Sequence, residues 1–253
     1  MRELDCESAE TALAGLAALF GVGDSTLAAE LSSFAFESVP ERLHREHPYE
    51  DLLCHHLGYQ YETLPTPKVI YWFHATRVLS DVDFAEGILP LPDVLERVWA
   101  NLEGLAADWS SPEEWRHFRT NMKGQGARQY RTKLTYQPEG GPFAHLVKPV
   151  VFEAGRVGNH DYLAVPEIVE DICLSYNEML GHDLLGQYRS ATTPCIVKFR
   201  HAGSWPGAVR AALMFVHHWL TDRDYSIHCS TCFDGRGIRV APEQRVAIER
   251  VEA

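Results

Sequence analysis

A histidine and a threonine at the end of an apolar run could bind one ligand together. The run is KVIYWF, residues 68–73, and it leads into His74 and Thr76. Because side chains alternate along a strand, His74 and Thr76 lie on one face, where an imidazole nitrogen and a hydroxyl can reach the same small molecule. The alternative is a buried histidine that bonds a backbone carbonyl and has no chemical role.

A glutamate near the C-terminus is a second candidate for chemistry. Glu243 in APEQRVAIERV directly precedes the alternating Val246 and Ile248, which predict a final strand. A carboxylate held at the start of a strand can stabilise the positive charge that develops on a sugar when its glycosidic bond breaks. Glu249 and Glu252 are weaker alternatives, and an ordinary surface glutamate is the simplest interpretation.

The charge of the chain is unevenly distributed. The formal net charge of −12 argues against a general nucleic-acid or anionic-membrane binder, because it repels phosphates at long range. Residues 115–133 nevertheless contain six Lys or Arg, no acid and three aromatic residues. This segment predicts either a solvated helix face followed by a loop or contact with a phosphate-bearing ligand, with Arg128 and Arg131 as candidate contacts.

Cysteine and histidine groups do not form a convincing metal site. Cys229 and Cys232, with His228 beside them, form a lone CxxC motif, whereas structural zinc sites use four ligands. We therefore expect no metal, and the six irregularly spaced cysteines indicate reduced thiols. The two histidines at residues 217–218 lie in a helical pattern and are interpreted as solvated helix polarity.

The elements that must position these residues predict an α+β fold. Residues 1–62 are expected to form a helical N-terminal appendage, and the prolines of residues 63–67 mark the start of a main domain over 63–253. This domain lacks the strand–helix alternation and the Gly-rich turn of a doubly wound nucleotide-binding fold. We therefore expect a split or mixed sheet.

Individual elements follow from periodicity and from capping residues, among them Ser111 as a helix N-cap and Gly21 and Gly181 as helix ends. Helices are predicted over 92–106, 111–122, 166–181 and 206–220, and strands over 68–73, 143–153, 194–201 and 245–251. Because of Pro149, residues 143–153 are expected to form an edge strand or two short strands. The Gly-rich polar residues 124–142 predict a mobile loop. Residues 225–240 predict a hairpin around Asp234 and Gly235.

These motifs resemble the ADP-ribosyltransferase superfamily, in particular its H-Y-E branch of poly(ADP-ribose) polymerases and diphtheria toxin. His74 and Thr76 match its His-x-Thr strand, Gly87 and Ile88 match the end of its following helix, and Glu243 matches its late glutamate. The resemblance implies a split mixed β-sheet that binds NAD in its cleft. It further implies that His74 bonds an NAD ribose hydroxyl and that Thr76 helps to hold that end of NAD.

The middle motif departs from this pattern. The branch has a tyrosine after a Gly-rich loop, which stacks on nicotinamide, whereas EGGPFAHLV offers Phe143. Tyr136 and Tyr162 are the alternatives. Because any aromatic ring can stack, Phe143 is compatible with the fold.

The resemblance implies an NAD-dependent ADP-ribosyltransferase-like enzyme, a glycosyltransferase that cleaves the nicotinamide–ribose bond and passes ADP-ribose to an unknown acceptor, a protein or a nucleic acid. Two alternatives stay open: an RNA 2′-phosphotransferase-like enzyme of the same fold, which also uses NAD, and a catalytically inactive binding or regulatory protein. No stretch approaches the ~20 apolar residues that span a bilayer, and the N-terminus lacks a basic signal region. We therefore expect a cytoplasmic protein without a membrane partner.

Overall fold

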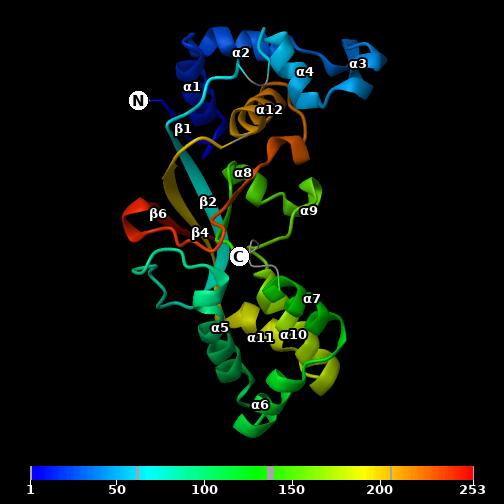
Figure 1. Ribbon diagram of the computed structural model, residues 1–253, viewed down its shortest axis with the longest axis vertical. Helices are drawn as coiled ribbons and strands as arrows, with labels where there is room; N and C mark the ends of the chain where they lie inside the picture. Colours follow the sequence, from blue (N-terminus) through cyan, green and yellow to red (C-terminus); the bar gives the residue numbers. More distant parts are fainter. Residues whose placement is uncertain (1, 61–62, 136–139, 206, 253) are drawn as a thin grey trace. The chain divides into compact units, whose positions relative to one another are not determined.

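A computed structural model describes residues 2–60, 63–135, 140–205 and 207–252 (Figure 1). Contacts divide the chain into two compact units, each made of separate segments. Unit 1 comprises Met1–Phe73, Ala144–Asn159 and Lys198–Phe233, and unit 2 comprises His74–Phe143, His160–Val197 and Asp234–Ala253. The domain boundary predicted at residues 62 and 63 falls inside unit 1 and stays a prediction.

The described residues form an α+β fold, as predicted. The helices are α1 (Ala9–Phe20), α2 (Asp24–Ser33), α3 (Glu41–Glu46), α4 (Tyr49–His56), α5 (Leu91–Ala106), α6 (Pro112–Asn121), α7 (Gly124–Thr135), α8 (Lys148–Val151), α9 (Ala154–Val157), α10 (Glu167–Leu180), α11 (Leu184–Ala191) and α12 (Ala208–Leu220). The strands are β1 (Glu3–Leu4), β2 (Val69–Val78), β3 (Phe143–His145), β4 (Thr193–Ala202), β5 (Cys232–Asp234) and β6 (Arg245–Arg250). Short 3₁₀ helices are η1 (Phe36–Ser38), η4 (Ile227–Cys229) and η5 (Pro242–Gln244).

The strands join in one sheet with β2 near its centre. The order is β5–β3–β2–β4–β6, and β1 pairs with β2 off this path. β1 runs parallel to β2, with Glu3 opposite Val69, whereas β3 runs antiparallel to it, with His145 opposite Phe73. β2 passes from unit 1 to unit 2 between Phe73 and His74. Both faces of β2 carry buried residues, which explains why its sequence is almost continuously apolar.

Unit 1 is organised around α12, which contacts α1, α2 and α4 (Figure 1). Ten of the thirteen residues of α12 are buried, as expected for a helix that is apolar on every side. The buried residues include His217 and His218, so the interpretation of this pair as solvated is wrong. Each ring is accommodated because its Nδ1 bonds a backbone carbonyl, that of Leu31 at 2.9 Å for His217 and that of Asp224 at 2.5 Å for His218.

Unit 2 contains a helical core to which α5, α6, α7, α10 and α11 contribute. Its largest buried side chains include Trp99, Trp115, Phe118 and Tyr176. Two of the aromatic residues of the basic segment, Trp115 and Phe118, therefore serve the core. Tyr130, the third, is half-buried and accepts a hydrogen bond from Trp99 Nε1 at 3.0 Å.

Several predicted helix ends are confirmed. Ser111 caps α6: its side chain accepts a hydrogen bond from the Glu114 amide, and the Glu114 carboxylate accepts one from the Ser111 amide. Gly21 and Gly181 follow α1 and α10 in the left-handed conformation. Local capping chemistry therefore marked these boundaries reliably.

Three predicted elements are wrong. Residues 124–135 form helix α7 rather than a mobile loop. The strand predicted over 143–153 stops at His145, and α8 begins at Lys148 because Pro149 suits the first turn of a helix and cannot donate to a sheet. The hairpin around Asp234 does not form, since Val240 pairs with Ile88 instead.

Among the described residues, no single helix combines the length and the apolarity that are needed to cross a bilayer. Helices α1 and α2 reach this length and apolarity only when they are counted together, and the chain bends by 102° between them.

Candidate functional site

Strand β2 presents His74 as a neutral hydrogen-bond acceptor. The His74 side chain is half-buried, and its Nδ1 lies 2.7 Å from the carbonyl oxygen of Phe143, the first residue of β3. Because a carbonyl only accepts, Nδ1 carries a proton, and in the neutral ring Nε2 is therefore the acceptor. Burial lowers the pKa of His74, against the smaller opposing effect of this hydrogen bond. The ring is therefore neutral at physiological pH.

Thr76 extends the same face of β2. It is half-buried, as is His74, whereas the intervening Ala75 is buried on the opposite face. The strand therefore places an imidazole and a hydroxyl side by side, as the sequence predicts. This much of the predicted pair is local geometry, set by the alternation of one strand.

Gly87 joins the second motif to the C-terminal segment, although residues 79–87 form turns and not the helix that the resemblance implies. It has φ +87°, and a Cβ at this position would lie 2.0 Å from the carbonyl oxygen of Val240. The neighbouring Ile88 exchanges two backbone hydrogen bonds of 2.9 Å with Val240. Only glycine therefore allows residues 87–88 to approach the chain so closely just before Glu243.

Glu243 lies in a short turn that hydrogen bonds of its neighbours hold in place. It belongs to η5 and is exposed, and the Gln244 side chain caps this turn by accepting from the Ala241 amide at 2.9 Å. On the other side, Arg245 Nη1 donates to the carbonyls of Asp83 and Phe84 at 2.6 and 2.8 Å. The carboxylate is thus carried by a fixed segment and is open to solvent.

The loop before Phe143 is tied to the segment that leads to Glu243. The Gly235 amide donates to the Pro142 carbonyl at 3.0 Å, and the Gly237 amide donates to the Gly141 carbonyl at 2.8 Å. All these residues belong to unit 2. Within this one unit, residue 74 therefore bonds residue 143, residues 87–88 contact residue 240, and the 141–142 backbone bonds residues 235 and 237, which shortly precede Glu243 in the chain.

The candidate aromatic residues differ in their surroundings. Phe143 is half-buried, and its backbone bonds His74. Tyr162 packs edge-on against His160, with ring centroids 4.7 Å apart. Tyr136 lies outside the described residues. Of the three candidates, Phe143 is the one that the described contacts connect to His74.

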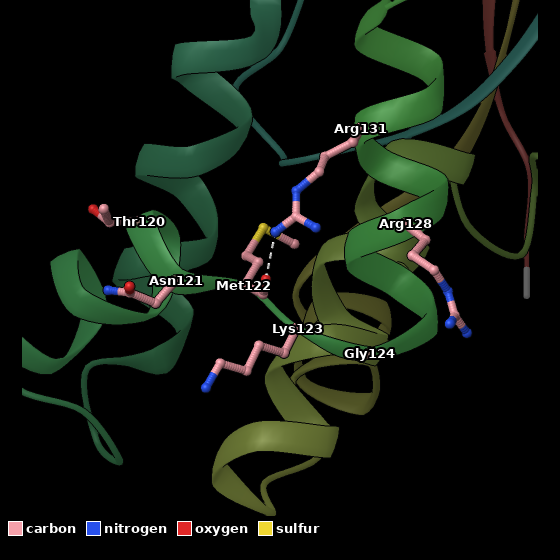
Figure 2. Close-up of a pocket in the computed structure, with 7 residues that line it drawn as sticks. All are labelled: Thr120, Asn121, Met122, Lys123, Gly124, Arg128 and Arg131. Atoms are coloured by element: carbon pink, nitrogen blue, oxygen red, sulfur yellow. Dashed lines mark hydrogen bonds between the residues drawn. The ribbon is translucent and has the colours of Figure 1, made fainter.

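Arg128 and Arg131 line a separate cavity of about 490 Å³ at the start of α7 (Figure 2). Lys123 is a third cation in its lining, together with Thr120, Asn121, Met122 and Gly124. Neither His74 nor Glu243 is part of the lining. Unit 2 therefore contains two candidate regions, the His74–Glu243 segments and this basic cavity.

Arg77 lines a second cavity, of about 530 Å³, and its hydrogen bonds indicate a structural role. The Arg77 guanidinium donates to the Thr192 hydroxyl at 3.0 Å and to the carbonyls of Leu163, Arg189 and Thr192 at 2.8, 2.8 and 2.7 Å. Burial lowers the pKa of Arg77 below its usual value. Sequence reasoning passed over this residue, although an arginine directly after the His-x-Thr segment was a visible signal.

The CxxC segment does not gather metal ligands. Cys229 is buried, which raises the pKa of its thiol, whereas Cys232 is exposed. Among the residues that the structure describes, no group of three or more His, Cys, Asp or Glu side chains could hold a metal ion.

No protein-family model, curated protein or solved structure matches this chain. The chemical inventory of unit 2 is consequently the basis for inferring a function. It consists of a neutral imidazole acceptor and a hydroxyl on one strand face and a carboxylate in a fixed exposed turn. It also includes an aromatic residue whose backbone carbonyl accepts a hydrogen bond from the imidazole.

Proposed function

We propose that the chain is an NAD-dependent ADP-ribosyltransferase-like enzyme that cleaves the nicotinamide–ribose bond. The observation that carries the proposal is the set of contacts between distant segments within unit 2. His74 bonds Phe143 at 2.7 Å, and Gly87 and Ile88 contact the backbone immediately before Glu243. The family resemblance rests on motifs in these same segments. The contacts come from the structure and do not depend on the resemblance.

His74 supplies an acceptor for a ribose hydroxyl. Its Nδ1 proton is used by the Phe143 carbonyl, so its Nε2 can accept from a hydroxyl donor. The lowered pKa keeps that lone pair free at neutral pH. Thr76, on the same strand face, adds a hydroxyl that can either donate or accept. Together they suit a sugar with several hydroxyl groups.

Glu243 supplies the negative charge for bond cleavage. As the nicotinamide leaves, positive charge develops on the ribose, and a fixed carboxylate stabilises it more than it stabilises the neutral sugar. Glu243 is exposed and therefore accessible to a substrate. In this proposal Phe143 provides the aromatic surface for nicotinamide, the sheet is of the split ADP-ribosyltransferase type, and the acceptor is a protein or a nucleic acid.

Incubation with NAD tests the activity directly. NAD labelled in nicotinamide reports bond cleavage, and NAD labelled in adenine reports transfer to an acceptor. Release of nicotinamide that depends on His74 and Glu243 is the expected result. Binding of NAD without release would instead indicate the inactive binding protein. The phenylalanine at position 143, where the family has a tyrosine, also favours that alternative.

The basic cavity favours one second candidate, an RNA 2′-phosphotransferase-like enzyme. Its lining holds Lys123, Arg128 and Arg131, which suit the phosphates of an RNA end. The substrate separates the two activities, because only the phosphotransferase requires a 2′-phosphorylated RNA. Loss of that phosphate, with NAD consumed in the same reaction, would identify the second candidate.

A further inference from the structure

We propose that the cavity at the start of α7 is a binding site for a phosphate ester, with Lys123, Arg128 and Arg131 as its ligands. The cavity has a volume of about 490 Å³, and its lining includes three cations and no carboxylate. The chain as a whole carries a formal charge of −12, so this concentration of positive charge is local. Anion binding here does not depend on NAD cleavage at Glu243.

The cations flank one turn of backbone. Figure 2 shows the Arg131 guanidinium reaching toward Met122, the Lys123 side chain extending away from the other side of the Met122–Gly124 turn, and Arg128 projecting from the opposite face of α7. Arg131 Nη2 donates to the Met122 carbonyl at 2.6 Å, which fixes the guanidinium at the cavity. A guanidinium has five N–H donors, so this bond leaves others available for phosphate oxygens.

Two of the cations have no internal counter-ion. Among the described residues, neither Lys123 nor Arg128 forms an ion pair, and both are exposed. Other basic residues of the same segment are paired, Arg119 with Glu96 and Lys133 with Asp171. Lys123 and Arg128 thus bring unpaired charge to the cavity, whereas Arg116, which also forms no ion pair among the described residues, lies outside its lining.

The backbone beneath the cations is held rigidly by α10. Ser175 Oγ donates to the Lys123 carbonyl at 2.8 Å, and the Gln125 amide donates to Glu178 Oε2 at 3.1 Å. A Cβ on Gly126 would lie 2.2 Å from the Asp171 carbonyl oxygen, so α7 lies directly against α10. This support preorganises the site, which lowers the entropic cost of binding.

The ligand contacts come from side chains rather than from the helix terminus. Glu178 already accepts from the Gln125 amide, so it occupies the start of α7. The side-chain donors of Thr120 and Asn121 bond the carbonyls of Arg116 and His117. The three cations consequently define the specificity, which is for negative charge with several acceptor oxygens.

Calorimetry with inorganic pyrophosphate tests the site on the full chain. We expect the Lys123→Gln/Arg128→Gln variant to bind about ten-fold more weakly than the wild type, because it loses two solvent-exposed charge contacts. We also expect wild-type affinity to fall between about 50 and 200 mM salt. The control variant Arg97→Gln/Arg116→Gln removes the same charge from exposed residues of α5 and α6 and should change affinity less than two-fold.

Competition then identifies the source of the phosphate. Displacement of pyrophosphate by NAD assigns the cavity to the substrate diphosphate, and displacement by a phosphate-terminated RNA oligonucleotide assigns it to an acceptor. The proposal is overturned if the wild type does not bind pyrophosphate, or if both double variants lose affinity equally while their thermal melts remain normal. Nicotinamide release is not a readout here, so failure of this site and failure of the proposed function are distinguishable.

Discussion

Replacing Gly87 by alanine should disturb the contact that connects the second motif to Glu243. A Cβ at this position would lie 2.0 Å from the Val240 carbonyl oxygen, and φ is +87°. The left-handed conformation costs about 1–2 kcal/mol for an alanine, and steric overpacking adds about 1–3 kcal/mol, giving a total of about 2–5 kcal/mol. The same displacement strains the two 2.9 Å hydrogen bonds between Ile88 and Val240.

Urea denaturation of Gly87→Ala, followed by circular dichroism, measures this loss. Two substitutions in the same unit separate its causes. Gly181→Ala has φ +77° and no atom within 4 Å of the new Cβ, so it should cost only about 1–2 kcal/mol. Gly104→Ala in α5 has free space and should stabilise the protein by about 0.5–1 kcal/mol. A Gly87→Ala variant no less stable than Gly181→Ala would refute the close approach to Val240.

Three further outcomes follow from the hydrogen bonds of individual side chains. His74→Ala should weaken NAD binding about 2- to 12-fold, as measured by calorimetry, because it removes one neutral hydrogen bond; unchanged affinity would contradict the assigned ribose contact. Arg77→Lys should lower the free energy of unfolding by about 1.5–3 kcal/mol, because lysine cannot keep the donors that reach Thr192 and three carbonyls. Burial lowers the pKa of His217 and of His218, so their contribution to stability is complete above the unfolded value of about 6.5 and is lost as pH falls through the folded pKa. Urea midpoints at decreasing pH should show this loss, and a double His217→Gln/His218→Gln variant should show less of it.

The predictable parts of the molecule are those set by local chemistry. The strand through His74, the Ser111 cap and the glycine ends at Gly21 and Gly181 all follow from residues close in sequence. The pairing of His74 and Thr76 on one face has the same origin, because alternation is a local property of a strand. The order of these elements was enough to predict the α+β class.

Tertiary packing decided what the sequence did not show. Helix α7 contains two glycines in its first turn, yet Gly126 is what permits contact with α10, and Lys133 adds an ion pair of 2.6 Å to Asp171. The burial of His217 depends on a carbonyl from α2, 186 residues earlier in the chain. The contact of Gly87 with Val240 is similarly remote, and no local pattern specifies it.

The rate of nicotinamide release by Glu243→Gln tests the central claim most directly. Glutamine keeps the size of the side chain and removes the negative charge, so turnover should fall about 10²–10³-fold, or about 2.7–4 kcal/mol, while NAD affinity is retained. Glu249→Gln on β6 is the matched control and should release nicotinamide at the wild-type rate. A Glu243→Gln variant that melts normally and releases nicotinamide as fast as the wild type would contradict the assignment of Glu243, and a wild-type chain that releases none would contradict the proposed activity itself.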